Sequence, residues 1–231
     1  GGGIIIGDND GLSKIFNAKI SYLKGYNTNL NSEFLIMGSI NFHQTNVEID
    51  NVDFENIFSE DVLNIVKSNF KINNSNYKDI FSDAIDMDFA SGKIEFVSFK
   101  NIGNDAMDFS GSNVKIYDSN FENIKDKLIS GGEESNIKIS KIYAVNSKSG
   151  IISKDGSKVY AKDIFFNNVQ IPFAAYQKKT QYDYGLLAVN DFKIDNFLIK
   201  FAKDDKSKIT LNNITQINTE NNKEGLSLVN Q

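Results

Sequence analysis

The sequence contains no cysteine, no arginine and no tryptophan, and it has a single histidine and a single proline. Without cysteine there is no disulfide framework, no thiolate metal site and no cysteine nucleophile. The lone His43 excludes a metal site of several histidines and leaves little room for a Ser-His-Asp triad. All 25 basic residues are lysines, and the formal net charge is −5. Because phosphate and base-edge recognition favour arginine, this composition argues against nucleic acid as the main partner.

Long apolar runs are also missing, so the sequence predicts no membrane span. Hydrophobic residues make up 40% and charged residues 24% of the 231 residues, which is ordinary for a soluble globular protein. The sequence starts at Gly1 without an initiator methionine or a signal peptide. We interpret this as a processed or trimmed start, so the missing signal says little about the compartment.

A repeat of about 22 residues dominates what is present. Apolar residues two positions apart mark short strands with one inward face. Helical repeats would need longer stretches of helical period, and leucine-rich repeats a dense leucine consensus. Three apolar columns keep one register from each repeat to the next: Val47, Phe70, Gly92, Val114, Ile137 and Val159; Ile49, Ile72, Ile94, Ile116, Ile139 and Ala161; Phe54, Tyr77, Phe99, Phe121, Ala144 and Phe166. The sequence therefore predicts an all-β fold, a right-handed parallel β-helix solenoid.

A polar column accompanies the apolar ones. It contains Asn56, Asp79, Asn101, Asn123, Asn146 and Asn168. An amide at one fixed turn of every coil predicts an asparagine ladder, in which each side chain bonds the turns above and below it.

Two irregularities interrupt the repeat. After Val159 the apolar spacing does not reappear one coil later but only at Phe192, which predicts an inserted loop over about 177–190. A similar excess before Val47 predicts insertions at 25–32 and 41–45. A shortened last coil over 209–218 should precede a polar tail at 219–231. We expect residues 1–231 to form one β-helix domain of a longer protein.

The strand that opens each coil carries the polar residues where chemistry is expected. Stacking these strands places Asp86 beneath Asp108 and Lys154 near Tyr176, with coils about 4.8 Å apart. Paired carboxylates can act as acid and base in glycoside hydrolysis, and a lysine or tyrosine can abstract a proton beside a uronate carboxylate. The predicted catalytic residues are Asp86, Asp108, Glu133, Lys154 and Tyr176. The competing interpretation is a solvated surface, where exposed ion pairs contribute only about 0–1 kcal/mol. The inward or outward phase of this strand stays open.

Further substrate contacts are expected around the inserted loop. Tyrosines offer a flat apolar face and a hydroxyl to a sugar ring, and lysines favour an anionic glycan. The predicted substrate-binding residues are Asp88, Asp155, Lys178, Lys179, Tyr182 and Tyr184. The run Asp8-Asn9-Asp10-Gly11 resembles the start of a calcium loop, but the downstream bidentate glutamate is missing. We therefore favour an ordinary turn there and predict no cofactor or metal.

The coil with its asparagine column resembles the right-handed parallel β-helix, or pectin-lyase-like, superfamily over about residues 12–218. The resemblance implies secreted or cell-surface proteins that act on polysaccharides as lyases, hydrolases or epimerases, and also non-catalytic adhesins. No family-specific catalytic motif accompanies it, and the Asp-Pro-His-Asp signature of mannuronan epimerases is missing. The predicted function is binding or processing of a polysaccharide; the alternative is a non-catalytic structural or adhesin scaffold.

Overall fold

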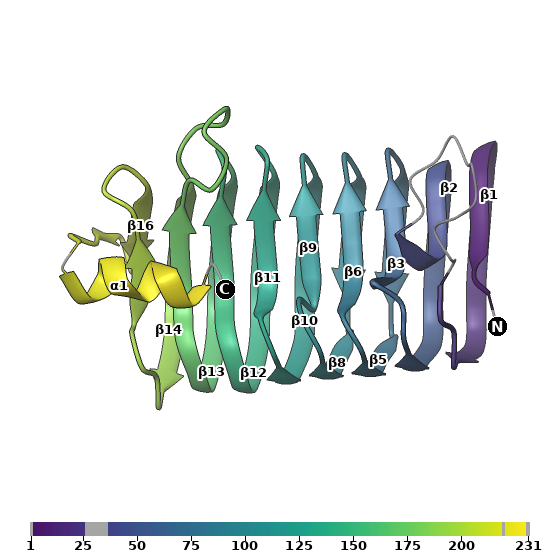
Figure 1. Ribbon diagram of the computed structural model, residues 1–231, viewed down its shortest axis with the longest axis horizontal. Coiled ribbons are helices and arrows are strands. Elements are labelled where there is room, and N and C mark those ends of the chain that lie inside the picture. Colours follow the sequence, from purple (N-terminus) through teal and green to yellow (C-terminus); the bar gives the residue numbers. More distant parts are fainter. Residues whose placement is uncertain (1, 26–36, 219, 230–231) are drawn as a thin grey trace.

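The chain folds into a single parallel β-solenoid in the computed structural model, which describes residues 2–25, 37–218 and 220–229. Its coils lie side by side along one axis, from β1 at the N-terminal end to β16 at the other (Figure 1). Strands pair in parallel with partners one coil away: Val114 lies opposite Gly92 on one side and Ile137 on the other. The predicted all-β solenoid and its coil repeat are confirmed, as the resemblance to pectin-lyase-like proteins implies.

Each complete coil contributes strand segments to three faces. Face A contains β3 (Asp61–Val66), β6 (Asp83–Asp88), β9 (Met107–Ser110), β11 (Lys127–Gly132) and β15 (Phe201–Lys203). Face B contains β4 (Asn69–Asn73), β7 (Ser91–Glu95) and β16 (Lys208–Leu211), and face C contains β5 (Asn76–Ile80) and β8 (Ser98–Ile102). Longer strands continue around the corners: β1 (Ile4–Ser21), β2 (Gly38–Ile57), β10 (Asn113–Ile124), β12 (Asn136–Lys154), β13 (Lys158–Tyr176) and β14 (Leu186–Asp195).

The predicted polar column forms the corner between faces C and A. Its six residues all have left-handed backbone conformation, with φ between 52° and 57°. Asparagine and aspartate tolerate this region better than other residues with a side chain, which explains why they recur there. Side-chain bonds also run along the axis: Asn101 Nδ2 donates to Asp79 Oδ1 at 2.6 Å, and Asn123 Nδ2 donates to Asn101 Oδ1 at 2.9 Å.

The interior is filled by the predicted apolar columns. Phe54, Tyr77, Phe99 and Phe121 are buried and stacked ring on ring, with centroids 4.7 to 5.0 Å apart. A buried serine column, which the sequence analysis missed, follows the corner between faces A and B. In this column Ser112 N donates to Ser135 Oγ of the next coil at 3.0 Å. The hydroxyls thus satisfy backbone groups that a corner leaves without strand partners.

The predicted alignment of the last coils is wrong. Val159 lies opposite Leu187, and Phe192 lies opposite Ile164, so the step across the insertion is longer than an ordinary coil but shorter than predicted. The loop occupies residues 177–185, between the end of β13 and the start of β14, and the predicted loop residues 186–190 are strand. The predicted insertion at 41–45 is also wrong, because these residues belong to β2. Residues 26–32 of the other predicted insertion lie outside the described residues.

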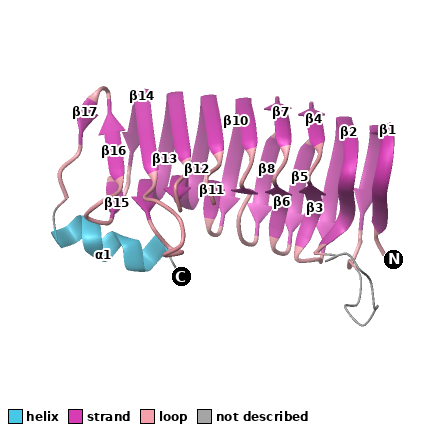
Figure 2. Ribbon diagram, turned by 90° about the horizontal axis from the view of Figure 1, so that it is seen from above, coloured by secondary structure: helices cyan, strands magenta, loops and turns pink. Residues whose placement is uncertain are grey.

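The predicted polar tail contains helix α1 (Glu220–Val229). Val229 is fully buried, and the helix packs across the C-terminal part of face A (Figures 1 and 2). It covers apolar side chains that point out of the solenoid there, which are Ile152, Ile171, Ala174, Tyr176 and Ala202. Before the helix, the short β17 (Ile214–Thr215) pairs antiparallel with β16. None of the described helical residues form a helix long and apolar enough to cross a membrane.

Candidate functional site

The outward side chains of face A form three columns that run along the solenoid. The first is Asp61, Asp83, Asp105, Lys127, Ser149 and Ile171; the second is Asn64, Asp86, Asp108, Ser130, Ile152 and Ala174; the third is Val66, Asp88, Ser110, Gly132, Lys154 and Tyr176. Met87, Met107 and Phe109, which alternate with these residues, are fully buried. The open question of phase is therefore settled: the acids point outward.

A polar cavity of about 250 Å³ lies over these columns. Strands β6, β9, β11, β12 and β13 supply its floor, the loop 177–185 supplies Lys178, and α1 supplies Val229. The lining residues are Asp83, Asn104, Asp105, Asp108, Asp126, Lys127, Lys154, Tyr176, Lys178 and Val229. The site is thus built by several successive coils, with the loop and the helix at its C-terminal side.

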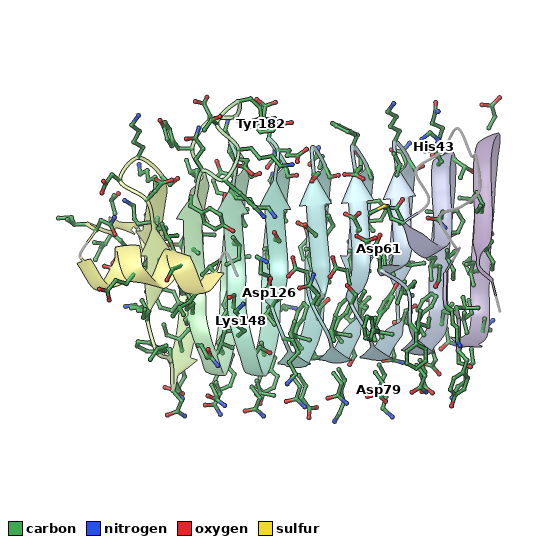
Figure 3. The ribbon with its side chains drawn as sticks, in the orientation of Figure 1. His43, Asp61, Asp79, Asp126, Lys148 and Tyr182 are labelled. Atoms are coloured by element: carbon green, nitrogen blue, oxygen red, sulfur yellow. The ribbon has the colours of Figure 1, made fainter. Side chains whose placement is uncertain are left out.

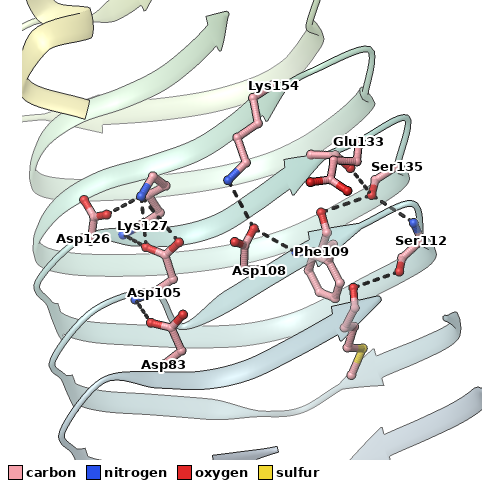
Figure 4. A network of polar contacts seen from close by, with 12 residues as sticks. Asp83, Asp105, Asp108, Phe109, Ser112, Asp126, Lys127, Glu133, Ser135 and Lys154 are labelled. Carbon is pink, nitrogen blue, oxygen red and sulfur yellow. Dashed lines mark hydrogen bonds and ion pairs between the residues drawn. The ribbon is translucent and has the colours of Figure 1, made fainter. Parts of the chain in front are cut away.

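Lys127 lies at the centre of a buried ionic network (Figure 4). Its Nζ forms an ion pair with Asp126 and lies 3.3 Å from Asp105 Oδ1, while Lys148 Nζ lies 3.0 Å from Asp126 Oδ1. Burial opposes the charged form of Asp126, but the ammonium groups of Lys127 and Lys148 outweigh it and lower the pKa of Asp126. Burial raises the pKa of Asp105 in spite of Lys127. The two carboxyls around this lysine therefore favour different protonation states.

Asp86 and Asp108 form a second carboxyl pair, directly opposite each other on adjacent coils. Burial, followed by the charges of neighbouring carboxylates that include Asp108, raises the pKa of Asp86 to about 8. Asn64 Nδ2 donates to Asp86 Oδ2 at 3.1 Å. Lys154 Nζ lies 3.5 Å from Asp108 Oδ1 (Figure 4). One member of the pair thus retains its proton at neutral pH, and the other has an ammonium group beside it.

Asp108 also acts on the other acids of the face. After the larger effect of burial, its charge contributes to the raised pKa values of Asp83, which reaches about 6, and of Asp88. The carboxyls around Asp108 consequently hold protons at pH values where free aspartate has lost them.

Two other groups in the cavity hold their protons firmly. Burial raises the pKa of the Tyr176 hydroxyl. Burial alone would lower the pKa of Lys127, but the carboxylates of Asp105 and Asp126 outweigh it and raise that pKa. Neither side chain is suited to take a proton from a substrate near neutral pH.

The first column also has a structural role. Asp105 N donates to Asp83 Oδ1 at 2.9 Å, and Lys127 N donates to Asp105 Oδ1 at 2.9 Å. Each of these carboxyls accepts the backbone N–H of the next coil where the strand begins, so they also stabilise the stacking of coils.

Of the predicted catalytic residues, Asp108, Lys154 and Tyr176 come together in the cavity. Asp86 and the predicted substrate-binding Asp88 lie on the neighbouring coil of the same face. Glu133 does not join them, because it lies at the corner between faces A and B with φ of 55°. There it forms an ion pair with Lys179 and lies 3.5 Å from the hydroxyl of Tyr182, and both contacts dock the loop onto the solenoid edge. Figure 3 shows Tyr182 in this loop.

The remaining predicted substrate-binding residues divide between the cavity and the loop. Lys178 lines the cavity. Asp155 is fully buried, and its Oδ1 accepts the backbone N–H of Lys178 at 2.6 Å and of Lys179 at 2.7 Å, so it anchors the loop instead of facing solvent. Tyr184 accepts a hydrogen bond from Lys206 Nζ at 2.6 Å, towards the C-terminal end.

The sequence analysis did not single out Asp83, Asn104, Asp105, Asp126 and Lys127, which all line the cavity. A signal for part of this set was present, since Asp61, Asp83, Asp105 and Lys127 follow one another at intervals of exactly one coil. Among the residues whose side chains are described, no cluster of three or more His, Asp or Glu is placed to hold a metal ion. The calcium alternative at 8–11 is untested, because the Asp8 and Asn9 side chains lie outside that set.

No protein-family model matches the chain, and no curated protein sequence matches it. Among solved structures it is similar to the catalytic domain of a GH87 alpha-1,3-glucanase in complex with nigerose, with 14% identity and a TM-score of 0.30. A variant of that domain in complex with nigerose matches with 13% identity and a TM-score of 0.32. A variant in complex with tetrasaccharides matches with 13% identity and a TM-score of 0.30. The matches cover 90% of this chain but only 63% of those domains. At this identity and TM-score, the likeness carries no information on the chemistry of this chain.

Proposed function

We propose that the chain binds a polysaccharide along face A and hydrolyses a glycosidic bond, with Asp86 as the proton donor and Asp108 as the second carboxylate. One observation carries the proposal: the two carboxyls lie opposite each other on adjacent coils, the pKa of Asp86 is raised to about 8, and the ammonium group of Lys154 lies beside Asp108. Glycoside hydrolysis needs such a pair, one carboxyl protonated and one ionised.

The acid–base assignment follows from the contacts. Asp86 is protonated at neutral pH because its pKa is raised to about 8, whereas Lys154 lies against Asp108 and supports a negative charge there. The two side chains extend from backbones about 4.8 Å apart, a spacing that allows the separation of about 5 Å between carboxyls that is typical of retaining glycosidases. We therefore expect Asp108 to act as the nucleophile and the anomeric configuration to be retained.

Elimination or epimerisation is the less suitable chemistry for this cavity. Both reactions need a base that removes a proton from a uronate ring. The pKa values of Tyr176 and Lys127 are raised, so these side chains stay protonated at neutral pH. A neutral glycan, which is cleaved without such a base, is therefore the favoured substrate.

The shape of the site favours a polymer. The outward columns continue over β6 and β3 on the N-terminal side of Asp108, where α1 does not cover them, so a linear chain lying along the solenoid axis would contact several coils at once. A polysaccharide of this kind lies outside the cell, and secretion or display at the cell surface is therefore part of the proposal. Protease accessibility on intact cells tests that part.

The test of hydrolysis compares the unmodified protein with Asp86→Asn and Asp108→Asn on a panel of neutral and uronate glycans. We expect new reducing ends without the ultraviolet absorbance of an unsaturated product, and a loss of about 100-fold or more in each variant. Asp118→Asn, which removes a carboxylate paired with Lys141 elsewhere on the surface, is the matched control. Unsaturated products, or variants as active as the control, would overturn the assignment.

The non-catalytic scaffold is the second candidate, and one observation favours it. Asp83 and Asp105 use their carboxyls to bind backbone N–H groups of the next coil, so part of the acidity of face A is structural. Binding of a glycan by the unmodified protein, without turnover on any member of a wide panel, would favour this candidate.

A further inference from the structure

Face B carries a column of lysines on an otherwise acidic protein. Lys71, Lys93, Lys115 and Lys138 point outward from four consecutive coils and lie directly opposite one another, and Tyr160 follows in the same column. Neighbouring ammonium groups are attached to backbones about 4.8 Å apart. Like charges placed opposite each other on paired strands are destabilising.

The members of this column differ in their partners. Lys71 Nζ lies 3.5 Å from Glu48 Oε1, and Lys93 Nζ lies 2.6 Å from Glu95 Oε1 and 5.2 Å from the centre of the Tyr117 ring. Lys115 and Lys138 are both exposed, and neither has a carboxylate partner within the described part of the chain. Two adjacent positive charges are therefore left without a counter-ion among the residues that the structure describes.

A groove of about 290 Å³ begins at this unpaired end of the column. Tyr117 and Tyr160 stand on either side of it, two coils apart, and the small side chain of Ser140 lies between them. Tyr160 is 44% exposed, and the groove also contains Lys138 and Lys162. Tyrosine combines an apolar ring face with a hydroxyl, a combination suited to sugar rings.

We propose that face B binds a linear anionic polysaccharide, with its carboxylate or sulfate groups on Lys115 and Lys138 and a sugar ring in the groove between Tyr117 and Tyr160. A bound anion would supply the missing counter-charge of the two lysines. This surface lies on a different face from the proposed hydrolytic site, and the proposal does not depend on hydrolysis.

Single-stranded nucleic acid fits this surface less well. Its phosphates are best bound by the bidentate guanidinium of arginine, and the chain has none. An anionic glycan requires only point charges and a sugar-sized groove.

The experiment measures binding of four probes at low salt: polygalacturonate, dextran sulfate, neutral dextran and single-stranded DNA. Polygalacturonate and dextran sulfate distinguish carboxylate from sulfate recognition. For whichever of the two binds, the double variant Lys115→Gln/Lys138→Gln should lose affinity by about tenfold. The matched control is Lys78→Gln/Lys100→Gln, which removes two lysines that lie opposite each other on face C. It should bind like the unmodified protein.

A second variant separates binding from folding. Lys138→Glu places a carboxylate opposite Lys115 and relieves the repulsion, so its melting temperature should be equal or higher while its affinity falls. Equal losses in the face B and face C variants would indicate a net-charge effect and overturn the proposal. The same holds if neither anionic glycan binds, or if DNA binds more tightly than both. Asp108→Asn should leave this binding unchanged.

Discussion

The two halves of face A share one backbone and one register, yet their outward surfaces differ. Over β6 and β9 the outward positions carry Asp86, Asp88 and Asp108, and the surface is open and acidic. Over β12 and β13 the same columns carry Ile152 and Ala174, and α1 covers them. Since the core-facing residues are similar in both halves, the outward side chains alone decide whether a coil presents a polar site or a docking surface.

The border between the halves carries the cations. Lys154 extends from β12 across Gly132 to Asp108, two coils away. Lys127 reaches back to Asp105 in the same way. The cations thus approach the acidic half from one side only, and burial remains the main cause of the raised pKa values of Asp61, Asp83 and Asp86.

Removing α1 from the apolar half of face A should have the largest effect on the free energy of unfolding. Val229→Asp would place a charge on the fully buried last residue of α1, and we expect a loss of about 2–4 kcal/mol in the free energy of unfolding. Urea denaturation measures the loss, and binding of a hydrophobic dye reports the uncovered patch. Ser227→Asp on the exposed side of the helix is the control. If both variants were equally stable, α1 would not be a packed cover.

Titration of Asp61, in the acidic half of face A, should have the next largest effect on the free energy of unfolding. Asp61 is 3% exposed, and burial, assisted by the charge of Asp86, raises its pKa from 3.8 to about 9. Between these values the unfolded chain has lost the proton and the folded chain keeps it, so the free energy of unfolding falls as pH rises. Asp61→Asn should therefore be more stable than the unmodified protein by about 1–2 kcal/mol near pH 8, and equally stable near pH 4.

Urea denaturation at the two pH values checks this expectation. Asp183→Asn, which changes an exposed carboxylate of the loop, should have no effect at either pH. A variant at Asp61 that was destabilised equally at both pH values would show that the carboxyl is needed for its contacts and is not a source of pH dependence.

The smallest stability effect is expected at the border. A Cβ on Gly132 would lie 2.8 Å from Lys154 Cε, the flexible part of a side chain that can move aside. Gly132→Ala should change the free energy of unfolding by less than about 0.5 kcal/mol. It should nevertheless displace Lys154 from Asp108 and lower any hydrolytic rate. Lys154→Met, which removes the same contact, should reproduce that loss; unchanged rates in both variants would contradict a role for this lysine.

The coil, the core columns and the outward acids could be predicted from the sequence because they recur once in every coil. The register after the insertion could not. Two apolar pairs with the same spacing, Leu187 with Val189 and Phe192 with Ile194, compete for one column, and only strand pairing decides between them. The prediction aligned the later pair with Val159, so the residues of the earlier pair were counted as loop and the predicted loop was too long.

Residues at corners were the other difficulty. Glu133 was predicted to be catalytic, but its left-handed backbone lies at the corner between faces A and B and turns the chain away from face A. Asp126 belongs to no outward column, yet it lines the cavity and contacts Lys127 and Lys148. Helix α1 was missed because its sequence is polar, and the apolar surface that holds it exists only once the coils are stacked.

The stacking of coils also determines how such a protein can change its size. Asp86 and Asp108 on face A, and Lys115 and Lys138 on face B, are each separated by one coil, a step of about 4.8 Å. Gain or loss of one whole coil would lengthen or shorten both faces together and leave every column in register. Gain or loss of a single residue within a strand would turn its core residues outward. The length of polymer that we propose each face to contact can therefore grow or shrink only by whole coils.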